Sequence, residues 1–334
     1  MVPLYFVLMK KFIYPLFLVI IFGCQQAEKR TVAQLSLAEV QNEITAAETK
    51  RLLFTLAADS MKGRDSDHKG YFKAAQFVTD YFATHSILPH YPNYQDTLSS
   101  KGVKSFNVVG QIGTYDPKKK TVLIGAHLDH VGIRGTEGDT IYNGANDNAT
   151  GSTAVLQIGK FLAQFDWDKN ILLALFADEE KGLRGAYHLA QRFKEEGVSL
   201  EYMVNFEMLG TTLTSGSNQV YMTGYNYSNM PQQMNAIAPN FVQFLPQAKA
   251  LNLFMRSDNY AFYKALNTPA FTLSSFDFKN FNFYHKAGDE AEKLEVENMN
   301  QIISTAAFTL AKMLHQKTVI TLTPEAQEAP LERE

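Results

Sequence analysis

The chain has 334 residues, of which 46% are hydrophobic and 19% are charged, and its formal net charge is −3. This length suits one large domain or two modest ones, and the composition is that of an ordinary globular protein. The slightly acidic balance, with no long block of Lys and Arg, argues against nucleic acid as a partner.

The amino end carries the features of an export signal. In the stretch "MKKFIYPLFLVIIFGC", two lysines precede an apolar run over 12–22, which is followed by Gly23 and Cys24. This run is shorter than the ~20 residues that span a membrane, so we predict a cleaved signal peptide over 1–23. The single cysteine follows a small residue and resembles the lipid-modified cysteine of bacterial lipoproteins, although a chance cysteine after a plain signal is the alternative. We therefore expect an extracytoplasmic protein anchored to a bacterial membrane through lipidated Cys24, in the periplasm or at the cell surface.

The remaining sequence predicts a tether, one folded domain and a tail. Residues 24–49 are polar and predict a tether that ends in a short helix. Apolar residues recur at helical spacing over 68–88 and 154–165, which predicts two helices within a single domain over 50–318. Residues 319–334 include the polar, Pro-containing stretch "TPEAQEAPLERE" and predict a disordered tail.

Six short apolar runs predict strands within this domain: "FNVVGQI", "TVLIGAHLD", "NILLALFAD", "YMVNFEMLG", "QVYMTG" and "PAFTLSS". Several of them lack polar alternation, which is typical of strands covered on both faces. Because the strands alternate with helices, we predict an α/β fold, a three-layer sandwich around a largely parallel mixed sheet.

Side chains that can bind a metal ion or transfer protons follow several of these strands. Ligands of open α/β sheets bind outside the carboxyl ends of the strands, and the residues in question are His127, Asp129, His130, Asp147, Glu179, Glu180, Glu207 and His285. Each has a structural explanation when taken singly, as a surface pair, a helix cap, a solvated strand end or an edge position. Gathered at one sheet edge, these carboxylates would repel one another unless cations neutralised them, and zinc accepts His, Asp and Glu as ligands.

Asp129 has a separate expected role. It lies two residues after His127, a spacing that suits a carboxylate accepting the imidazole N–H that does not bind metal.

Together these motifs resemble the di-zinc aminopeptidase family of bacterial leucyl aminopeptidase, which is related to glutamate carboxypeptidase II and glutaminyl cyclase. The stretches that carry the resemblance occur in the family's order over about residues 50–315: "GAHLDHVG", "NGANDNATGS", "FADEEKGLRGA", "NFEMLG", "RSDNYAFYKALNTPAF" and "YHKAGDEAEKL".

The resemblance implies two zinc ions per chain and a role for each motif residue. It implies that Asp147 bridges the two metals and that the peptide bond after it is cis. The implied metal ligands are His127, Asp147 and Glu207 for one zinc and Asp147, Glu180 and His285 for the other. The implied catalytic residues are Glu179, as general base, and Asp129, which orients His127.

Three positions depart from the family pattern. Glu207 stands where many members have Asp, and Asn259 replaces the histidine of the usual S-D-H triplet. Some members place a tyrosine just before that triplet, where this chain has Phe254, Met255 and Arg256. The sequence therefore names no group that would stabilise the developing oxyanion.

The function expected from these features is that of a lipid-anchored metallopeptidase, most simply an aminopeptidase acting on peptides. A glutaminyl cyclase-like enzyme with a single zinc, a non-catalytic binding ectodomain on the same fold, and a two-metal phosphoesterase are the alternatives. Bound zinc per chain and a comparison of peptide anilides with phosphate esters would discriminate among them.

Overall fold

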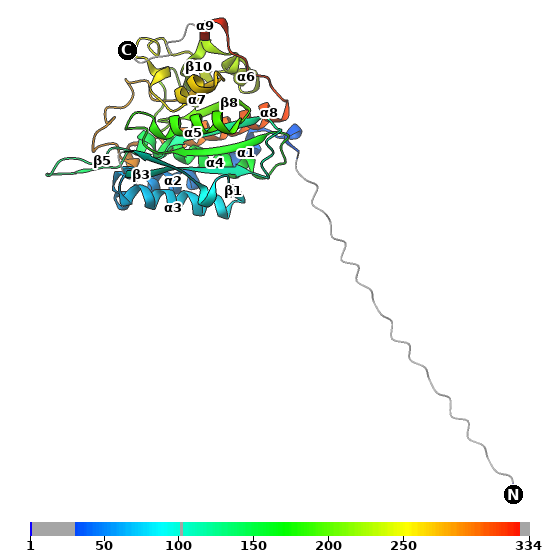
Figure 1. Cartoon of the computed structure of the whole chain (residues 1–334), viewed down its shortest axis with the longest axis horizontal. Helices are drawn as coiled ribbons and strands as arrows, with labels where there is room; N and C mark the ends of the chain where they lie inside the picture. The colour runs from blue at the N-terminus through cyan, green and yellow to red at the C-terminus, as the bar shows by residue number, and fades with distance from the viewer. Residues whose placement is uncertain (2–30, 101–102, 328–334) are drawn as a thin grey trace. The chain divides into compact units, whose positions relative to one another are not determined.

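A nine-stranded mixed sheet runs through the computed structural model (Figure 1), which describes every residue except 2–30, 101–102 and 328–334. The strand order is β1-β3-β7-β4-β8-β11-β9-β10, and β2 also pairs with β3. The strands of this sheet are β1 (Ile87–Pro89), β2 (Gln95–Ser100), β3 (Val103–Ile112), β4 (Thr121–His127), β7 (Asn170–Phe176), β8 (Leu200–Phe206), β9 (Val220–Met222), β10 (Val242–Gln243) and β11 (Ala270–Ser274). Two further strands, β5 (Gly132–Ile133) and β6 (Ile141–Tyr142), form a separate antiparallel ribbon.

The centre of the sheet is parallel and buried on both faces. Strands β7, β4, β8 and β11 pair in parallel, whereas β3 joins β7 and β9 joins β11 in antiparallel fashion. All seven residues of β4 and of β7 are buried, as their lack of polar alternation predicts. The six predicted strands and the mixed α/β fold are thus confirmed.

Helices cover both faces of the sheet. One face is covered by α4 and α8, with α1, α2 and α3 packed beside them, and the other by α5 and α7 (Figure 1). The helices are α1 (Leu37–Glu43), α2 (Ala46–Leu56), α3 (Lys69–Thr84), α4 (Thr150–Leu162), α5 (Arg184–Glu196), α6 (Met230–Ile237), α7 (Asn259–Leu266), α8 (Val296–His315) and α9 (Pro324–Gln327). The helices predicted over 68–88 and 154–165 correspond to α3 and α4, and the predicted apolar stripe of α3 is buried.

The folded domain extends beyond both predicted boundaries. Residues 31–49, predicted as part of a tether, contain α1 and the start of α2, and Val40 of α1 is fully buried against the helical layer that includes α8. The Ser36 and Glu39 side chains form a capping box that starts α1. At the other end, Ile320 and Ala326 are buried, so the predicted disorder is wrong for 319–327. Both segments are short and intersperse polar with apolar residues, so their sequences resemble solvated chain.

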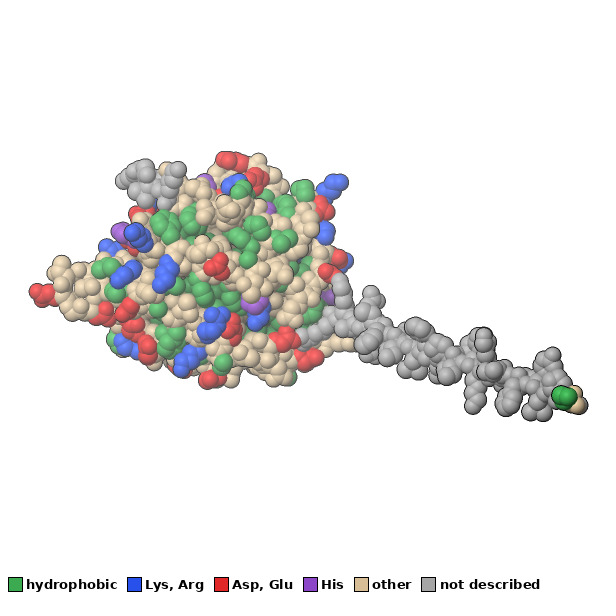
Figure 2. All heavy atoms as spheres, turned by 90° about the horizontal axis from the view of Figure 1, so that it is seen from below, with side chains coloured by type: hydrophobic (Ala, Val, Ile, Leu, Met, Phe, Trp, Pro, Cys, Tyr) green, Lys and Arg blue, Asp and Glu red, His purple; other side chains and the backbone are tan. Residues whose placement is uncertain are grey.

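The predicted signal peptide, Cys24 and residues 328–334 lie outside the described residues. Among the described helices, none is long and apolar enough to cross a membrane. On the face that Figure 2 presents, acidic and basic side chains are interspersed with apolar ones.

Arg64 joins the segments that surround the carboxyl end of β4. Its guanidinium is fully buried and donates hydrogen bonds to the carbonyl oxygens of Leu128, Leu56, Asn143 and Gly144 at 2.6–2.8 Å. Burial lowers the pKa of Arg64 to about 10, while neighbouring carboxylates oppose that shift, so the side chain is charged at neutral pH. The Arg64 guanidinium therefore links the chain after β4 to the loop before Asp147.

We predict that Arg64→Met destabilises the protein by about 3–5 kcal/mol, because four buried carbonyls lose their donor at once. Chemical denaturation in urea measures this loss. The matched control is Arg51→Met, which removes an arginine that is 52% exposed and bonded to Glu48, and it should cost about 1 kcal/mol or less. Equal losses in the two variants would contradict the role assigned to Arg64.

Candidate metal centre and active site

The carboxyl ends of three neighbouring parallel strands bring the predicted residues together. β4 ends at His127, which pairs in register with Phe176 at the end of β7, and β8 ends at Phe206 on the other side of β4. The residues that follow these strands therefore share one edge of the sheet. Asp147 reaches the same edge from the turn before α4, and His285 reaches it from the loop before α8.

The first cluster contains His127, Asp147 and Glu207. His127 Nε2 lies 3.2 Å from Asp147 Oδ1 and 3.5 Å from Glu207 Oε1. The histidine is fully buried, and the side chains of Asp147 and Glu207 are 3% and 12% exposed. These three groups can offer ligand atoms to one metal ion.

The second cluster shares Asp147 and contains three further residues. His285 Nε2 lies 3.0 Å from Asp147 Oδ2 and 3.1 Å from Glu180 Oε1. His130 Nδ1 lies 3.0 Å from the same Glu180 oxygen. His285 is the most exposed member, with 39% of its side chain accessible, so solvent reaches the site from its side. The two carboxylate oxygens of Asp147 thus face different clusters.

Backbone and side-chain hydrogen bonds hold the Asp147 turn in place. The Asp289 carboxylate accepts bonds from the backbone N–H groups of Asn146 and Asp147, at 2.7 and 3.0 Å. The Asn148 side chain donates to the carbonyl of Phe206 and accepts from the N–H of Met208, which fixes the turn against the segment that carries Glu207. The Asp147–Asn148 peptide is cis, as the resemblance implies.

The three consecutive acids after β7 point in different directions. Asp178 is buried, and its carboxylate accepts hydrogen bonds from the Ser66 and Ser105 hydroxyls, away from the two clusters. Glu180 belongs to the second cluster. Glu179 interacts electrostatically most with His127 and then with Glu207, both of the first cluster. Asp178 therefore supports the turn, and of the two glutamates Glu180 is the one that offers a ligand atom to a cluster.

Asp129 does not bind His127 in the way the sequence predicts. His127 Nδ1 lies 3.1 Å from the backbone carbonyl oxygen of Asp129, whereas the nearest carboxylate oxygen is 3.8 Å away. The carboxylate instead accepts the backbone N–H groups of Glu179 and Glu180, at 3.1 and 3.3 Å. The carbonyl of Asp129 thus fixes the His127 ring, and its side chain positions the two glutamates.

The electrostatics of the site are those of a crowded set of buried charges. Burial raises the pKa of Glu179 well above its ordinary value and that of Asp129 to about 7. Burial alone would lower the pKa of His285, but contacts with Asp147 and Glu180 raise it to about 10. The imidazoles of His127 and His285, whose pKa values are both raised, are thus drawn toward the protonated state, in which they act as substitute cations.

A divalent metal fits both clusters. Ligand atoms around a tetrahedral zinc are about 3.3–3.5 Å apart, and the separations given above lie between 3.0 and 3.7 Å. His127 Nε2 is buried and makes no hydrogen bond with the described residues, although Asp147 Oδ1 is only 3.2 Å away. Close approach without hydrogen-bond geometry is what a cation between the two atoms produces.

Several residues at this site escaped the sequence reasoning. The sequence places His130 at the strand end but predicts no role for it, and Arg64 and Asp289 have hydrogen-bond partners that are distant in sequence. Asp258 is fully buried, neither of its carboxylate oxygens has a hydrogen-bond partner among the described residues, and burial raises its pKa well above the usual range. The ring of Tyr284 stacks on that of His285, with 4.1 Å between the ring centroids. The sequence signals that could have pointed to Tyr284 and His130 are the "YH" pair and the second histidine of "HLDH".

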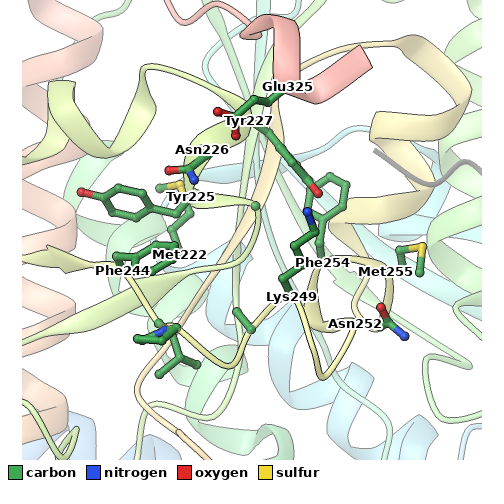
Figure 3. A pocket seen from close by; sticks show the side chains of 14 residues that line it. Met222, Tyr225, Asn226, Tyr227, Phe244, Lys249, Asn252, Phe254, Met255 and Glu325 are labelled. Atoms are coloured by element: carbon green, nitrogen blue, oxygen red, sulfur yellow. The ribbon is translucent and has the colours of Figure 1, made fainter. Parts of the chain in front are cut away.

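A cavity of about 300 Å³ lies elsewhere in the molecule (Figure 3). It is lined mainly by aromatic and apolar side chains of the segments 222–227 and 244–255, together with Glu325 of α9. No residue of the two clusters lines it.

A model of peptidase family M28 matches residues 107–310, more than half of the chain. The chain belongs to peptidase family M28. The matched region contains every residue of the two clusters, so the predicted family is confirmed.

Curated relatives of this M28 peptidase match over part of their length. A probable zinc metalloprotease of Pyrenophora tritici-repentis is 33% identical over 100 residues, which cover 30% of this chain and 23% of the relative. A probable leucine aminopeptidase of Arthroderma otae is 25% identical over 220 residues, which cover 63% of this chain and 56% of the relative. The chain thus spans less than two thirds of the length of either relative.

Solved structures of other proteins share the fold of this M28 chain. The LapA aminopeptidase of Legionella pneumophila superposes with a TM-score of 0.67 at 20% identity, covering 92% of this chain and 78% of LapA. The glutaminyl cyclase of Porphyromonas gingivalis gives a TM-score of 0.62 at 15% identity, covering 80% of this chain and 98% of the cyclase. At these identities the likeness shows the fold alone.

Proposed function

We propose that this M28 chain is an aminopeptidase that uses two zinc ions to remove amino-terminal residues from peptides. The observation that carries the proposal is the pair of clusters that share Asp147, one oxygen facing each. The set of imidazoles and carboxylates suits zinc, and the relatives named above include a probable zinc metalloprotease and a probable leucine aminopeptidase.

In this proposal Asp147 would be shared between two metal sites. His127 and Glu207 complete the first site, and Glu180 and His285 belong to the second. Zinc supplies Lewis-acid activation of the attacking water and of the scissile carbonyl. Metal charge also offsets the repulsion among the buried carboxylates of the site.

Glu179 is the proposed general base. It lies beside the metal-binding Glu180, yet its charge interacts most with His127 of the first cluster. Burial raises its pKa well above that of an ordinary glutamate, and the charges of Glu207 and Asp258 add to this effect. A raised pKa favours a carboxylate that accepts a proton from water near neutral pH and returns it to the leaving amine.

Tyr284 is the proposed donor to the developing oxyanion. Burial raises the pKa of its hydroxyl, and the charges of Asp147, Glu207 and Glu180 raise it further, so the phenol stays protonated. Stacking on the His285 ring limits its movement. A neutral O–H near the reacting carbonyl can donate a hydrogen bond that strengthens as negative charge develops.

Two metals are favoured over the single zinc of a glutaminyl cyclase-like enzyme because each cluster has its own histidine in addition to the shared carboxylate. A non-catalytic ectodomain would have no need of Glu179 beside a complete ligand set. Hydrolysis of a phosphate ester tests the alternative that the protein is a phosphoesterase.

We predict that Glu179→Gln keeps near-normal zinc content but lowers kcat on an aminoacyl anilide by about 10²–10⁴, because an amide cannot accept the proton of water. Glu180→Gln should instead lose zinc from the second cluster and regain part of its activity when zinc is added. Zinc content and kcat of both purified variants measure the difference.

The wild-type protein is assayed in parallel on a peptide with amino-terminal glutamine and on a phosphate ester. Cyclisation or ester hydrolysis in place of anilide cleavage would reject the aminopeptidase proposal. Metal loss in Glu179→Gln with full metal in Glu180→Gln would mean that the two roles are exchanged.

We predict that Tyr284→Phe lowers kcat by about 10²–10³, the usual effect of removing one oxyanion donor, while zinc content stays unchanged. Steady-state kinetics and metal analysis measure both quantities. The control is Tyr115→Phe, a tyrosine that packs on His90, outside both clusters. Unchanged kcat in Tyr284→Phe would show that the donor lies elsewhere.

We also propose export and lipid anchoring through Cys24, which lies outside the described residues. The charged start, the short apolar run and the small residue before the cysteine support it. Cys24→Ser should abolish labelling by a radioactive fatty acid in a bacterial host and release the protein from the membrane fraction. Labelling that persists in Cys24→Ser would place the anchor elsewhere.

A further inference from the structure

Arg256 is an exposed cation that none of the roles assigned so far uses. It follows the 3₁₀-helix Leu253–Met255 and precedes Ser257 and Asp258, which are both buried. Among the described residues, its guanidinium forms no ion pair with a carboxylate. The charge of this side chain is therefore available to a group that comes from outside the chain.

An aromatic ring, rather than an acid, holds the guanidinium in place. The Cζ atom of Arg256 lies 5.6 Å from the centroid of the Phe278 ring. The Phe278 ring in turn packs near those of Phe276 and Tyr284, with 4.4 and 6.2 Å between the ring centroids. A cation–π contact of this kind positions an arginine without neutralising its charge.

The turn that carries Phe278 is firmly held. Phe278 has φ +66°, which is rare for a bulky residue. The Asp277 carboxylate accepts hydrogen bonds from the backbone N–H groups of Lys279, Asn280 and Thr214, at 2.9, 3.1 and 3.0 Å. These bonds fix the turn, so the ring is presented in one place as a support for the guanidinium.

The charge of Arg256 reaches the active site. It interacts electrostatically with the Tyr284 hydroxyl, and so do the carboxylates of Asp147, Glu207 and Glu180. These carboxylates repel an anionic substrate, and a fixed cation beside them offsets that repulsion. Arg256 is thus placed to favour a substrate that carries a negative charge.

We infer that Arg256 binds a carboxylate of the peptide substrate and so gives the enzyme a preference for peptides with a negative charge near the scissile bond. The inference rests on the proposed function. The planar guanidinium matches a carboxylate with two parallel N–H···O bonds. An acidic side chain and the terminal carboxylate of a dipeptide present the same group, and the experiment distinguishes these two sources.

The test compares the zinc-loaded wild-type protein with Arg256→Met on three pairs of substrates whose members differ in one carboxylate. The pairs are leucylglycine and leucylglycinamide, the 4-nitroanilides of glutamate and glutamine, and the carboxyl-terminal amides of leucyl-aspartate and leucyl-asparagine. For the wild type, we expect KM to be about 10-fold or more lower for the acidic member of at least one pair, because charge-assisted hydrogen bonds are strong.

In Arg256→Met the two members of that pair should have equal KM, while kcat stays within about twofold of the wild type. A preference in the first pair identifies the terminal carboxylate as the source, and one in the second or third pair identifies an acidic side chain. The matched control is Lys279→Met, which removes an exposed charge next to Phe278 but leaves the guanidinium. It should keep the wild-type preference.

Three outcomes would overturn this inference and leave the proposed function standing. The wild type could cleave the substrates with no preference in any pair, the preference could survive in Arg256→Met, or Lys279→Met could lose it to the same extent. The first outcome needs no variant, so the inference is tested even if Arg256→Met fails to fold. A wild-type protein that cleaves none of the six substrates would reject the proposed function itself.

Discussion

The burial of many like charges at one edge of a sheet is the constraint on which the rest of this structure depends. Strands β4, β7 and β8 end side by side, and the turn before α4 and the loop before α8 reach the same edge, which brings several carboxylates within a few ångströms of three imidazoles. Burial raises the pKa of Asp129 to about 7 and that of Glu179 well above its ordinary value. Such a site is stable only with cations inside it, and the proposed metals meet that need while they provide the chemistry.

A rigid frame holds these charges apart in two clusters. Arg64 fastens the chain after β4 to the turn before Asp147, and Asp289 and Asn148 fasten that turn on its other sides. Each of these bonds ends on backbone, so the loops are held whatever side chains they carry. The frame lets Asp147 present one oxygen to each cluster, which a mobile loop could not maintain.

Much of this arrangement could be predicted from the sequence. Strands buried on both faces lack polar alternation, as in β4 and β7, and the carboxyl ends of parallel strands lie at one edge of the sheet. The motif residues were found because they interrupt apolar runs. The place of His130 in the second cluster could not be predicted, because its partner Glu180 is 50 positions away in sequence. The place of Tyr284 could not be predicted either, because the stacking of its ring on His285 is set by the fold of the loop. The prediction for the Asp129 carboxylate is wrong because a residue two positions after His127 can face the imidazole with its carbonyl or with its side chain. Here the carbonyl faces the imidazole, and the carboxylate accepts backbone N–H groups of Glu179 and Glu180. The tether prediction is wrong at 31–49 because a helix as short as α1 resembles solvated chain until its partner, α8, is known.

The most direct test of the central claim is an anomalous difference map from crystals of the zinc-loaded protein, recorded on both sides of the zinc absorption edge. The account predicts two peaks on either side of the Asp147 carboxylate, one beside His127 and Glu207 and one beside Glu180 and His285. A single peak, or two peaks that do not share Asp147, would contradict the two-metal centre.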